Sequence, residues 1–110
     1  MITKAVRQAL AAVIACLVVA TGARAAEIAV DQRDMQFVPN AVAIVVGDSI
    51  RFTDTDRIAH DITVVDPLGA AVDHGMDYFN QQIVVKFEKA GAYQVRCRIH
   101  PAMKMTITVK

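Results

Sequence analysis

The chain has 110 residues, of which 12 are Lys or Arg, 11 are Asp or Glu and 55% are hydrophobic, and its formal net charge is +1. This length suits one small domain with a single modest core. No clustered run of cations supplies the basic footprint of a nucleic-acid-binding protein, so this class is excluded.

The first 25 residues have the three parts of a secretory signal peptide. Lys4 and Arg7 give a positive start, residues 9–20 form an unbroken apolar run, and Ala23-Arg24-Ala25 has the small-x-small pattern of a cleavage site. The run is too short and wrongly flanked for a membrane span, so we expect no stable membrane insertion. No twin-arginine pair is present, so we expect export through the general secretory route to the periplasm.

Cleavage after Ala25 would leave residues 26–110 as one domain with 9 cations and 11 acids, a net charge of −2. Val13-Ile14-Ala15-Cys16 also resembles a lipoprotein box, but the apolar run continues past Cys16, so lipid anchoring is the weaker alternative. The mature chain would then contain one cysteine, Cys97, in an oxidising compartment. Such a thiol is buried and inert, paired with another molecule, a metal ligand or a nucleophile.

The rest of the chain has short stretches in which apolar residues alternate, separated by turn signals. We expect strands over 27–32, 35–39, 41–46, 49–53, 60–65, 83–87, 93–97 and 106–110. Residues 67–75, with two glycines, are expected to form a long irregular connection. Because no stretch after the signal has a helical period, the prediction is a small antiparallel all-β sandwich.

Three donor side chains stand close together near the C-terminus. Cys97, His100 and Met103 have the spacing C-x-x-H-x-x-M, which places a thiolate, an imidazole and a thioether in one short loop. This mixture suits copper, because two His and one Cys with a weak axial Met form the blue-copper electron-transfer arrangement. The loop supplies one His, and His60 is the obvious candidate for the second.

Strand alternation supports this grouping. Cys97 shares the parity of Tyr93 and Val95, and His60 shares that of the apolar residues after it, so both side chains should point inward. Each residue alone has a simpler interpretation, since C-x-x-H is common by chance, a lone His is more often hydrogen-bonded, and Met fills cores. Together they favour a metal site at one end of the sandwich.

Three further residues are predicted to lie outside the metal site. His74 lies in the expected connection and is predicted to be a solvated histidine, rather than a second point of copper capture. Met35 is predicted to be a packing residue rather than a ligand. Tyr93, just after Gly91, is predicted to anchor the turn structurally.

Several short motifs carry a resemblance over nearly the whole chain after residue 25. They are Phe37-x-Pro39, Val46-Gly47-Asp48-x-Ile50-x-Phe52, His60, Gly91-Ala92-Tyr93 and Cys97-x-x-His100-Pro101-x-Met103. Together they resemble the cupredoxins, and more narrowly the amicyanin and plastocyanin group of type 1 blue copper proteins. The resemblance implies a Greek-key β-sandwich with one copper ion held by His60, Cys97, His100 and Met103.

The same resemblance implies a non-enzymatic, monomeric carrier of single electrons between redox partners such as a dehydrogenase or a c-type cytochrome. A periplasmic copper carrier or chaperone is the alternative, and it would need an exchangeable site. A catalytic copper enzyme is disfavoured, because one filled site in one small domain leaves no open position for substrate.

The chain departs from the family pattern at three places. Asp61 replaces the usual Asn after the first histidine, Arg98-Ile99 replaces a frequent Thr-Pro, and Ala102 replaces an aromatic residue. We expect an Asp61–Arg98 ion pair to replace the hydrogen bond of the Asn and to fix the Cys97 loop against the His60 strand. The alternative is that both side chains point into solvent.

Overall fold

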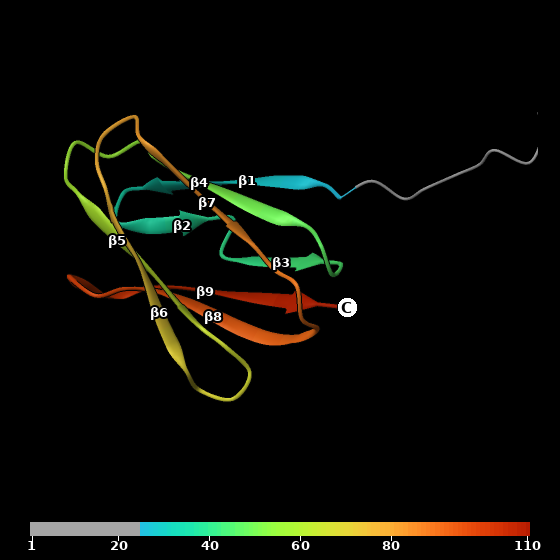
Figure 1. Cartoon of the computed structure of the whole chain (residues 1–110). Helices are drawn as coiled ribbons and strands as arrows, with labels where there is room; N and C mark the ends of the chain where they lie inside the picture. The colour runs from blue at the N-terminus through green and yellow to red at the C-terminus, as the bar shows by residue number, and fades with distance from the viewer. Residues whose placement is uncertain (1–24) are drawn as a thin grey trace, which may run out of the picture.

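The computed structural model describes residues 25–110, which form nine strands (Figure 1). In chain order the strands are β1 (Glu27–Arg33), β2 (Gln36–Val38), β3 (Ala41–Ile44), β4 (Ser49–Asp54), β5 (His60–Val65), β6 (Ala71–Asp77), β7 (Gln82–Lys86), β8 (Gly91–Cys97) and β9 (His100–Val109). The predicted signal peptide, residues 1–25, lies outside the described residues except for Ala25. In the described part there is no helix that is long and apolar enough to cross a membrane.

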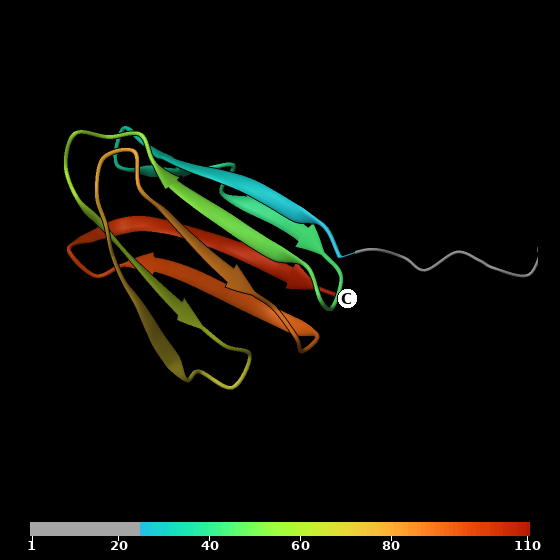
Figure 2. The same ribbon diagram turned by 45° about the horizontal axis from the view of Figure 1, so that its top comes forward.

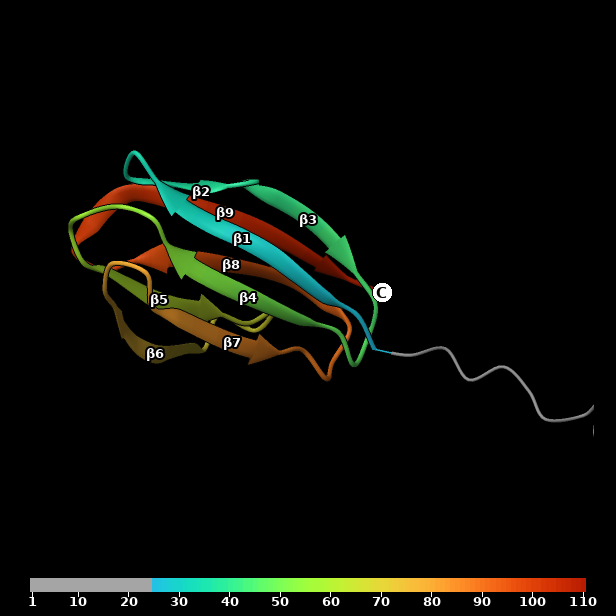
Figure 3. The same cartoon turned by 90° about the horizontal axis from the view of Figure 1, so that it is seen from above.

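Two sheets pack face to face, as Figures 2 and 3 show. One has the strand order β2-β1-β4-β7 and the other the order β3-β9-β8-β5-β6. The predicted all-β Greek-key sandwich is confirmed. The sheets are mixed rather than purely antiparallel, because β1 runs parallel to β4 and β3 runs parallel to β9.

The core comes from the inward positions of alternating strands. In β4 every second residue is buried, and in β9 the buried positions are Met103, Met105, Ile107 and Val109. Apolar surface removed from water at these positions stabilises the sandwich by about 25 cal/mol per Å². The predicted strand 106–110 was too short at its start, because β9 already begins at His100.

The predicted irregular connection over residues 67–75 was wrong in its second half. Residues 71–77 form strand β6, which pairs antiparallel with β5 at the edge of its sheet. The first four residues of β6 are all exposed, so the strand lacks the apolar alternation by which a half-buried strand is recognised.

Irregular pairing concentrates at one end of the sandwich, opposite the C-terminus (Figure 1). Arg96 pairs with Lys104 and Cys97 pairs with His100, so residues 101–103 of β9 have no partner in β8 between these two pairs. A second register shift lies between Asp61 and Thr63 of β5. Bulges of this kind redirect side chains near functional sites.

Candidate metal centre

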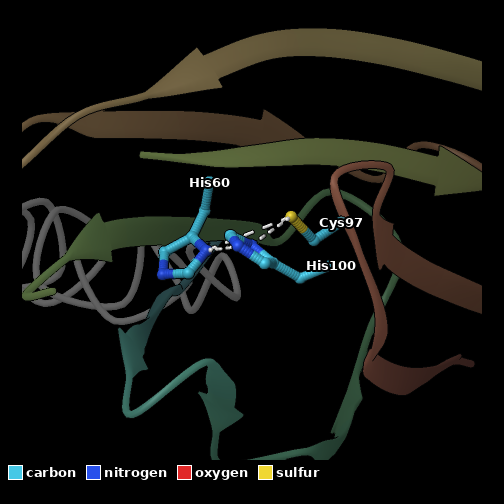
Figure 4. A group of neighbouring side chains, drawn as sticks. All are labelled: His60, Cys97 and His100. Atoms are coloured by element: carbon cyan, nitrogen blue, oxygen red, sulfur yellow. Dashed lines mark hydrogen bonds between the residues drawn. The ribbon is translucent and has the colours of Figure 1, made fainter. Parts of the chain in front are cut away.

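Three of the four predicted site residues meet at the irregular end of the sandwich. His60 begins β5, Cys97 ends β8, and His100 begins β9 after a two-residue turn. Their donor atoms face one another, as Figure 4 shows. The Nδ1 atoms of His60 and His100 are 3.2 Å apart, and the Cys97 Sγ lies 3.5 Å from Nδ1 of His100 and 4.0 Å from Nδ1 of His60.

These three distances define a triangle of the size that a metal ion needs. A point equidistant from its corners lies about 2.1 Å from each donor atom, which matches metal–imidazole bonds of ~2.0–2.1 Å and approaches metal–thiolate bonds of ~2.3 Å, the lengths known for zinc. His60 and Cys97 are buried, whereas His100 is half-buried. The donors therefore form a nearly prebuilt set with one edge close to solvent.

Met103, the fourth predicted residue, lies in the unpaired stretch of β9, three residues after His100. Its side chain is 1% exposed and has the same parity as Met105 and Ile107, so it points into the sandwich. The soft thioether therefore lies on the inner side of the chain that carries His100. His100 and Met103 lie on strand β9, and only residues 98 and 99 form the turn that was predicted as a longer loop.

A carboxylate fixes the orientation of the His60 ring. Its Nε2 lies 2.7 Å from Oδ2 of Asp56, on the opposite side of the ring from Nδ1. Asp56 also accepts hydrogen bonds from the backbone N–H groups of Asp34 at 2.7 Å and Met35 at 2.9 Å. With the proton on Nε2, the lone pair of Nδ1 is free to bind a metal, as in carboxylate–histidine–metal arrangements.

The pKa of Asp56 agrees with this role. Burial opposes ionisation, but the amide of Met35, the imidazole of His60 and the amide of Asp34 together hold the pKa of the carboxyl below its usual range. Asp56 is therefore ionised near neutral pH. Asp56 lies between the strands predicted over 49–53 and 60–65, and no role was predicted for it. The signal that could have found it is a carboxylate four residues before a candidate histidine ligand.

The predicted Asp61–Arg98 ion pair was wrong, although the two segments are tied together. Oδ1 of Asp61 accepts a hydrogen bond from the backbone N–H of Arg98 at 3.2 Å, whereas the guanidinium of Arg98 reaches Asp73 at 3.3 Å. The backbone N–H of Asp61 also donates to the Cys97 Sγ at 3.3 Å. Buried Asp61 needs a donor at short range, and the amide of the turn is closer to it than the exposed end of a long side chain.

A cluster of three buried polar side chains lies close to His60. Gln32, Asp54 and Asp77 are all 0% exposed, and Nε2 of Gln32 donates to Asp77 at 2.6 Å. One oxygen of each of these three residues has no hydrogen-bond partner among the described residues. Burial raises the pKa of Asp54, and it raises the pKa of Asp77 to about 6. No local sequence pattern predicts this cluster, because its members come from three separate strands.

Asp77→Asn is expected to stabilise the metal-free protein at pH 8 by about 1–3 kcal/mol, and much less at pH 4. The folded state holds a proton on Asp77 that the unfolded chain releases at lower pH. Stability is therefore lost as pH rises from 3.8, the ordinary pKa of an Asp side chain, to about 6, and above that range the full cost of the buried charge remains. Urea unfolding at both pH values measures the difference.

The matched control is Asp73→Asn, the same chemical change on the same strand. The neighbouring Asp61 carboxyl, the amide of Gly75 and Arg98 lower the pKa of Asp73, so its charge stabilises the fold above the unfolded pKa. This variant should be less stable at pH 8, and the deficit should shrink as pH falls. An Asp77→Asn protein that behaves in the same way would contradict the cost assigned to the buried carboxylate.

The three remaining sequence predictions have mixed outcomes. The hydroxyl of Tyr93 donates to the carbonyl of Lys89 at 2.8 Å, so this residue anchors the turn as predicted. His74 is exposed as predicted, although it lies on β6 rather than in a loop. Met35 is 46% exposed and has a φ of 59°, so the prediction of a packing residue was wrong.

Comparisons with known proteins agree with this geometry. Residues 24–110 match the family model of copper binding proteins of the plastocyanin/azurin family. A plastocyanin from Ulva prolifera is 37% identical over 90 residues, which cover 73% of this chain and 92% of the plastocyanin. A pseudoazurin from Methylorubrum extorquens is 39% identical over 79 residues, which cover 68% of this chain and 51% of the pseudoazurin.

The fold comparison leads to the same group. A reduced variant of amicyanin superposes with a TM-score of 0.70 and 27% identity, covering 86% of this chain and 88% of the amicyanin. A Cu(I) form of another amicyanin variant gives a TM-score of 0.71 at 24% identity, covering 76% of this chain and 82% of the other. One cysteine and two histidines whose donor atoms surround one point, with the buried Met103 three residues after His100, fit one type 1 copper ion as the cofactor. The chain belongs to the plastocyanin/azurin family of copper-binding proteins, and it is a cupredoxin.

Proposed function

We propose that this cupredoxin is a non-enzymatic, monomeric carrier of single electrons between redox proteins of the periplasm. His60, Cys97, His100 and Met103 would hold the copper, and residues 26–110 would form the mature domain after the general secretory route has removed residues 1–25. The observation that carries the proposal is the convergence of Nδ1, Sγ and Nδ1 around one point within a single described domain. The names of its relatives, plastocyanin and pseudoazurin, support it.

A type 1 copper supplies a one-electron couple between Cu(I) and Cu(II). The chain contributes rigidity, because the candidate ligands are held by groups outside the site. Asp56 fixes the His60 ring, the amide of Asp61 donates to the Cys97 sulfur, and strand pairing holds the main chain on both sides. Ligands on packed strands move little, which suits a site that must accept both oxidation states.

The half-buried ring of His100 is the part of the site nearest to solvent. Ile99 before it is 50% exposed, and Pro101 and Ala102 after it are also exposed, so the surface around the ring is apolar. We infer that electrons enter or leave through this edge while a redox partner covers it. Ala102, in place of an aromatic residue, makes this apolar surface smaller than in the family pattern.

Cyclic voltammetry of the copper-loaded protein with a Cu(I)-specific chelator tests the proposal. A carrier should cycle reversibly by one electron and retain its copper through many cycles, because His60 and Cys97 are buried and give a chelator little access. Rapid loss of Cu(I) to the chelator would instead support copper trafficking. Absence of a reversible couple in protein that retains copper would contradict electron carriage.

Asp56→Asn is expected to raise the reduction potential and to lower Cu(II) affinity by about 10–100-fold. The carboxylate makes the His60 imidazole a stronger donor, and a stronger donor stabilises Cu(II) more than Cu(I). Spectroelectrochemistry gives the potential, and competition with a Cu(II) chelator gives the affinity.

Asp56→Glu is the rescue variant, because it restores the negative charge with one added methylene, and its potential should lie between those of the wild type and Asp56→Asn. In the wild type the Asp56 carboxylate also accepts hydrogen bonds from the backbone N–H groups of Asp34 and Met35, and both variants change this acceptor. The unfolding of each metal-free variant should therefore be measured as well. A potential for Asp56→Asn at or below that of the wild type would contradict the role of the carboxylate.

A further inference from the structure

A groove of about 580 Å³ lies on the outer face of the larger sheet, beside the candidate copper site. Its lining includes three cations, Arg96, Arg98 and Lys104, and one acid, Asp73. Three cross-strand pairs build it, since Lys104 of β9 is opposite Arg96, Arg96 is opposite Thr63, and Thr63 is opposite Asp73. The groove is therefore one row of residues across four neighbouring strands.

The groove exists because shorter side chains adjoin the two long side chains at one end of this row. Thr63, Val65 and Ala71 form the floor, and the long side chains of Arg96 and Lys104 stand on one side of it. Asp73 and Arg98 form the other side, where they pair at 3.3 Å. This pairing neutralises Arg98 and leaves Arg96 and Lys104 as the free positive charges.

Arg96 and Lys104 are like charges placed directly opposite each other on antiparallel strands, an arrangement that destabilises a sheet. Both are exposed, and within residues 25–110 neither forms an ion pair with a carboxylate. Arg96 donates instead to the side-chain oxygen of Gln94 at 2.5 Å. A negative group bound between the two cations would convert this repulsion into attraction.

The groove also borders the chain segment that carries one candidate ligand. Cys97 lines it, although the side chain is only 1% exposed, so the contact is with the chain segment that carries the buried thiolate. Arg96 is the residue directly before Cys97. An object seated in the groove is therefore next to a candidate copper ligand, and the groove also borders Pro101, the residue after His100.

We propose that this groove is a docking surface for an acidic patch on a redox-protein partner. This inference rests on the proposed function of electron carriage. Charge complementarity identifies the partner as acidic, because two free cations face outward from a domain whose residues 26–110 have a net charge of −2. Complementary charges of this kind accelerate association at low salt and fix the orientation of the partners. The docked partner contacts the chain segment that carries Cys97.

The test uses a hexaglutamate peptide as the probe and ¹⁵N-labelled, copper-loaded Cu(I) protein. At low salt, amide shifts should change at Thr63, Asp73, Lys104 and residues 96–98. Arg96→Glu combined with Lys104→Glu should weaken the peptide affinity at least tenfold. Lys86→Glu combined with Lys89→Glu changes the net charge equally in another part of the surface, and it should weaken the affinity less than twofold.

A kinetic arm uses the anionic oxidant hexacyanoferrate(III). The Cu(I) protein should be oxidised several-fold more slowly in the Arg96/Lys104 variant than in the Lys86/Lys89 variant, and the difference should disappear at high salt. Equal rates at low salt would overturn the groove as a route to the copper. Arg96→Glu alone should raise the melting temperature, because it replaces a like-charge pair with Lys104 by a pair of opposite charges. A lower melting temperature would contradict the repulsion between Arg96 and Lys104 on which the proposal rests.

Two other outcomes also overturn the proposal. Peptide shifts confined to the surroundings of His100 would place docking at the exposed ring edge. Phosphate binding in the groove without peptide binding would make it a site for small anions. Peptide binding is measured without redox cycling, so the two proposals can fail separately. Intact peptide binding with failed redox cycling rejects electron carriage. Intact redox cycling without peptide binding rejects the docking surface.

Discussion

Cys97→Ser is expected to abolish the intense blue colour of the Cu(II)-loaded protein and to leave the fold intact. The colour of a type 1 site depends on charge transfer from a thiolate to copper, and Cys97 is the one cysteine among residues 25–110. A serine hydroxyl is a poor ligand for copper in this mixture of soft and borderline donors. It is nearly the same size as the thiol, and it can still accept the hydrogen bond from the amide of Asp61.

The visible spectrum and the far-UV circular dichroism of both proteins measure these two expectations. Met103→Leu is the matched control, because it replaces the weak axial thioether by an apolar side chain of similar volume. It should keep the blue colour and change the reduction potential. A colourless wild-type protein after Cu(II) loading, or a blue Cys97→Ser protein, would contradict the assignment of Cys97 as the ligand.

Strand parity explains why the convergence of Cys97 and His60 could be predicted from the sequence. Cys97 and His60 each share a two-residue period with apolar neighbours, and this period fixes the face on which a side chain lies. The structure buries both residues. The same rule extends through β9 to Met103, although the sequence analysis began that strand too late.

Strand parity does not predict a strand whose residues are mostly exposed. Strand β6 was missed because its exposed residues need no apolar alternation, and pairing with β5 alone keeps it extended. Asp34 and Met35 have φ values of 55° and 59°, and this turn presents both amides to Asp56. Such a turn depends on a carboxylate 21 residues further along the chain, which no local pattern contains.

Asp61 and Arg98 show a different limit of sequence reasoning. Opposite charges at two neighbouring segments suggested an ion pair, and the segments are indeed joined at Asp61. The partner is the backbone amide of Arg98, since the turn brings this amide to the carboxylate while the guanidinium reaches across to Asp73. Because Asp73 belongs to the strand that was not predicted, its competition for Arg98 could not be foreseen.

Cu(II) binding is expected to raise the thermal midpoint of the protein by about 10–30 °C. A ligand that binds only the folded state stabilises it by about 3–4 kcal/mol when its concentration is one hundred to one thousand times its dissociation constant. Each kcal/mol shifts the midpoint of a domain of this size by about 4–8 °C. The Nδ1 atoms of His60 and His100 lie 3.2 Å apart, and an ion between them would be bound by both nitrogens at once.

Thermal melts of metal-free and Cu(II)-loaded protein, followed by circular dichroism, measure this shift. His100→Ala is the informative control, because it removes one candidate ligand from the half-buried edge of the site while His60 and Cys97 stay buried. In this variant the copper-dependent shift should fall to a small fraction of the wild-type value, and the metal-free midpoint should change little. Identical midpoints for the two wild-type forms would show that the donors do not act as one site, since a prebuilt set of three must couple copper binding to folding.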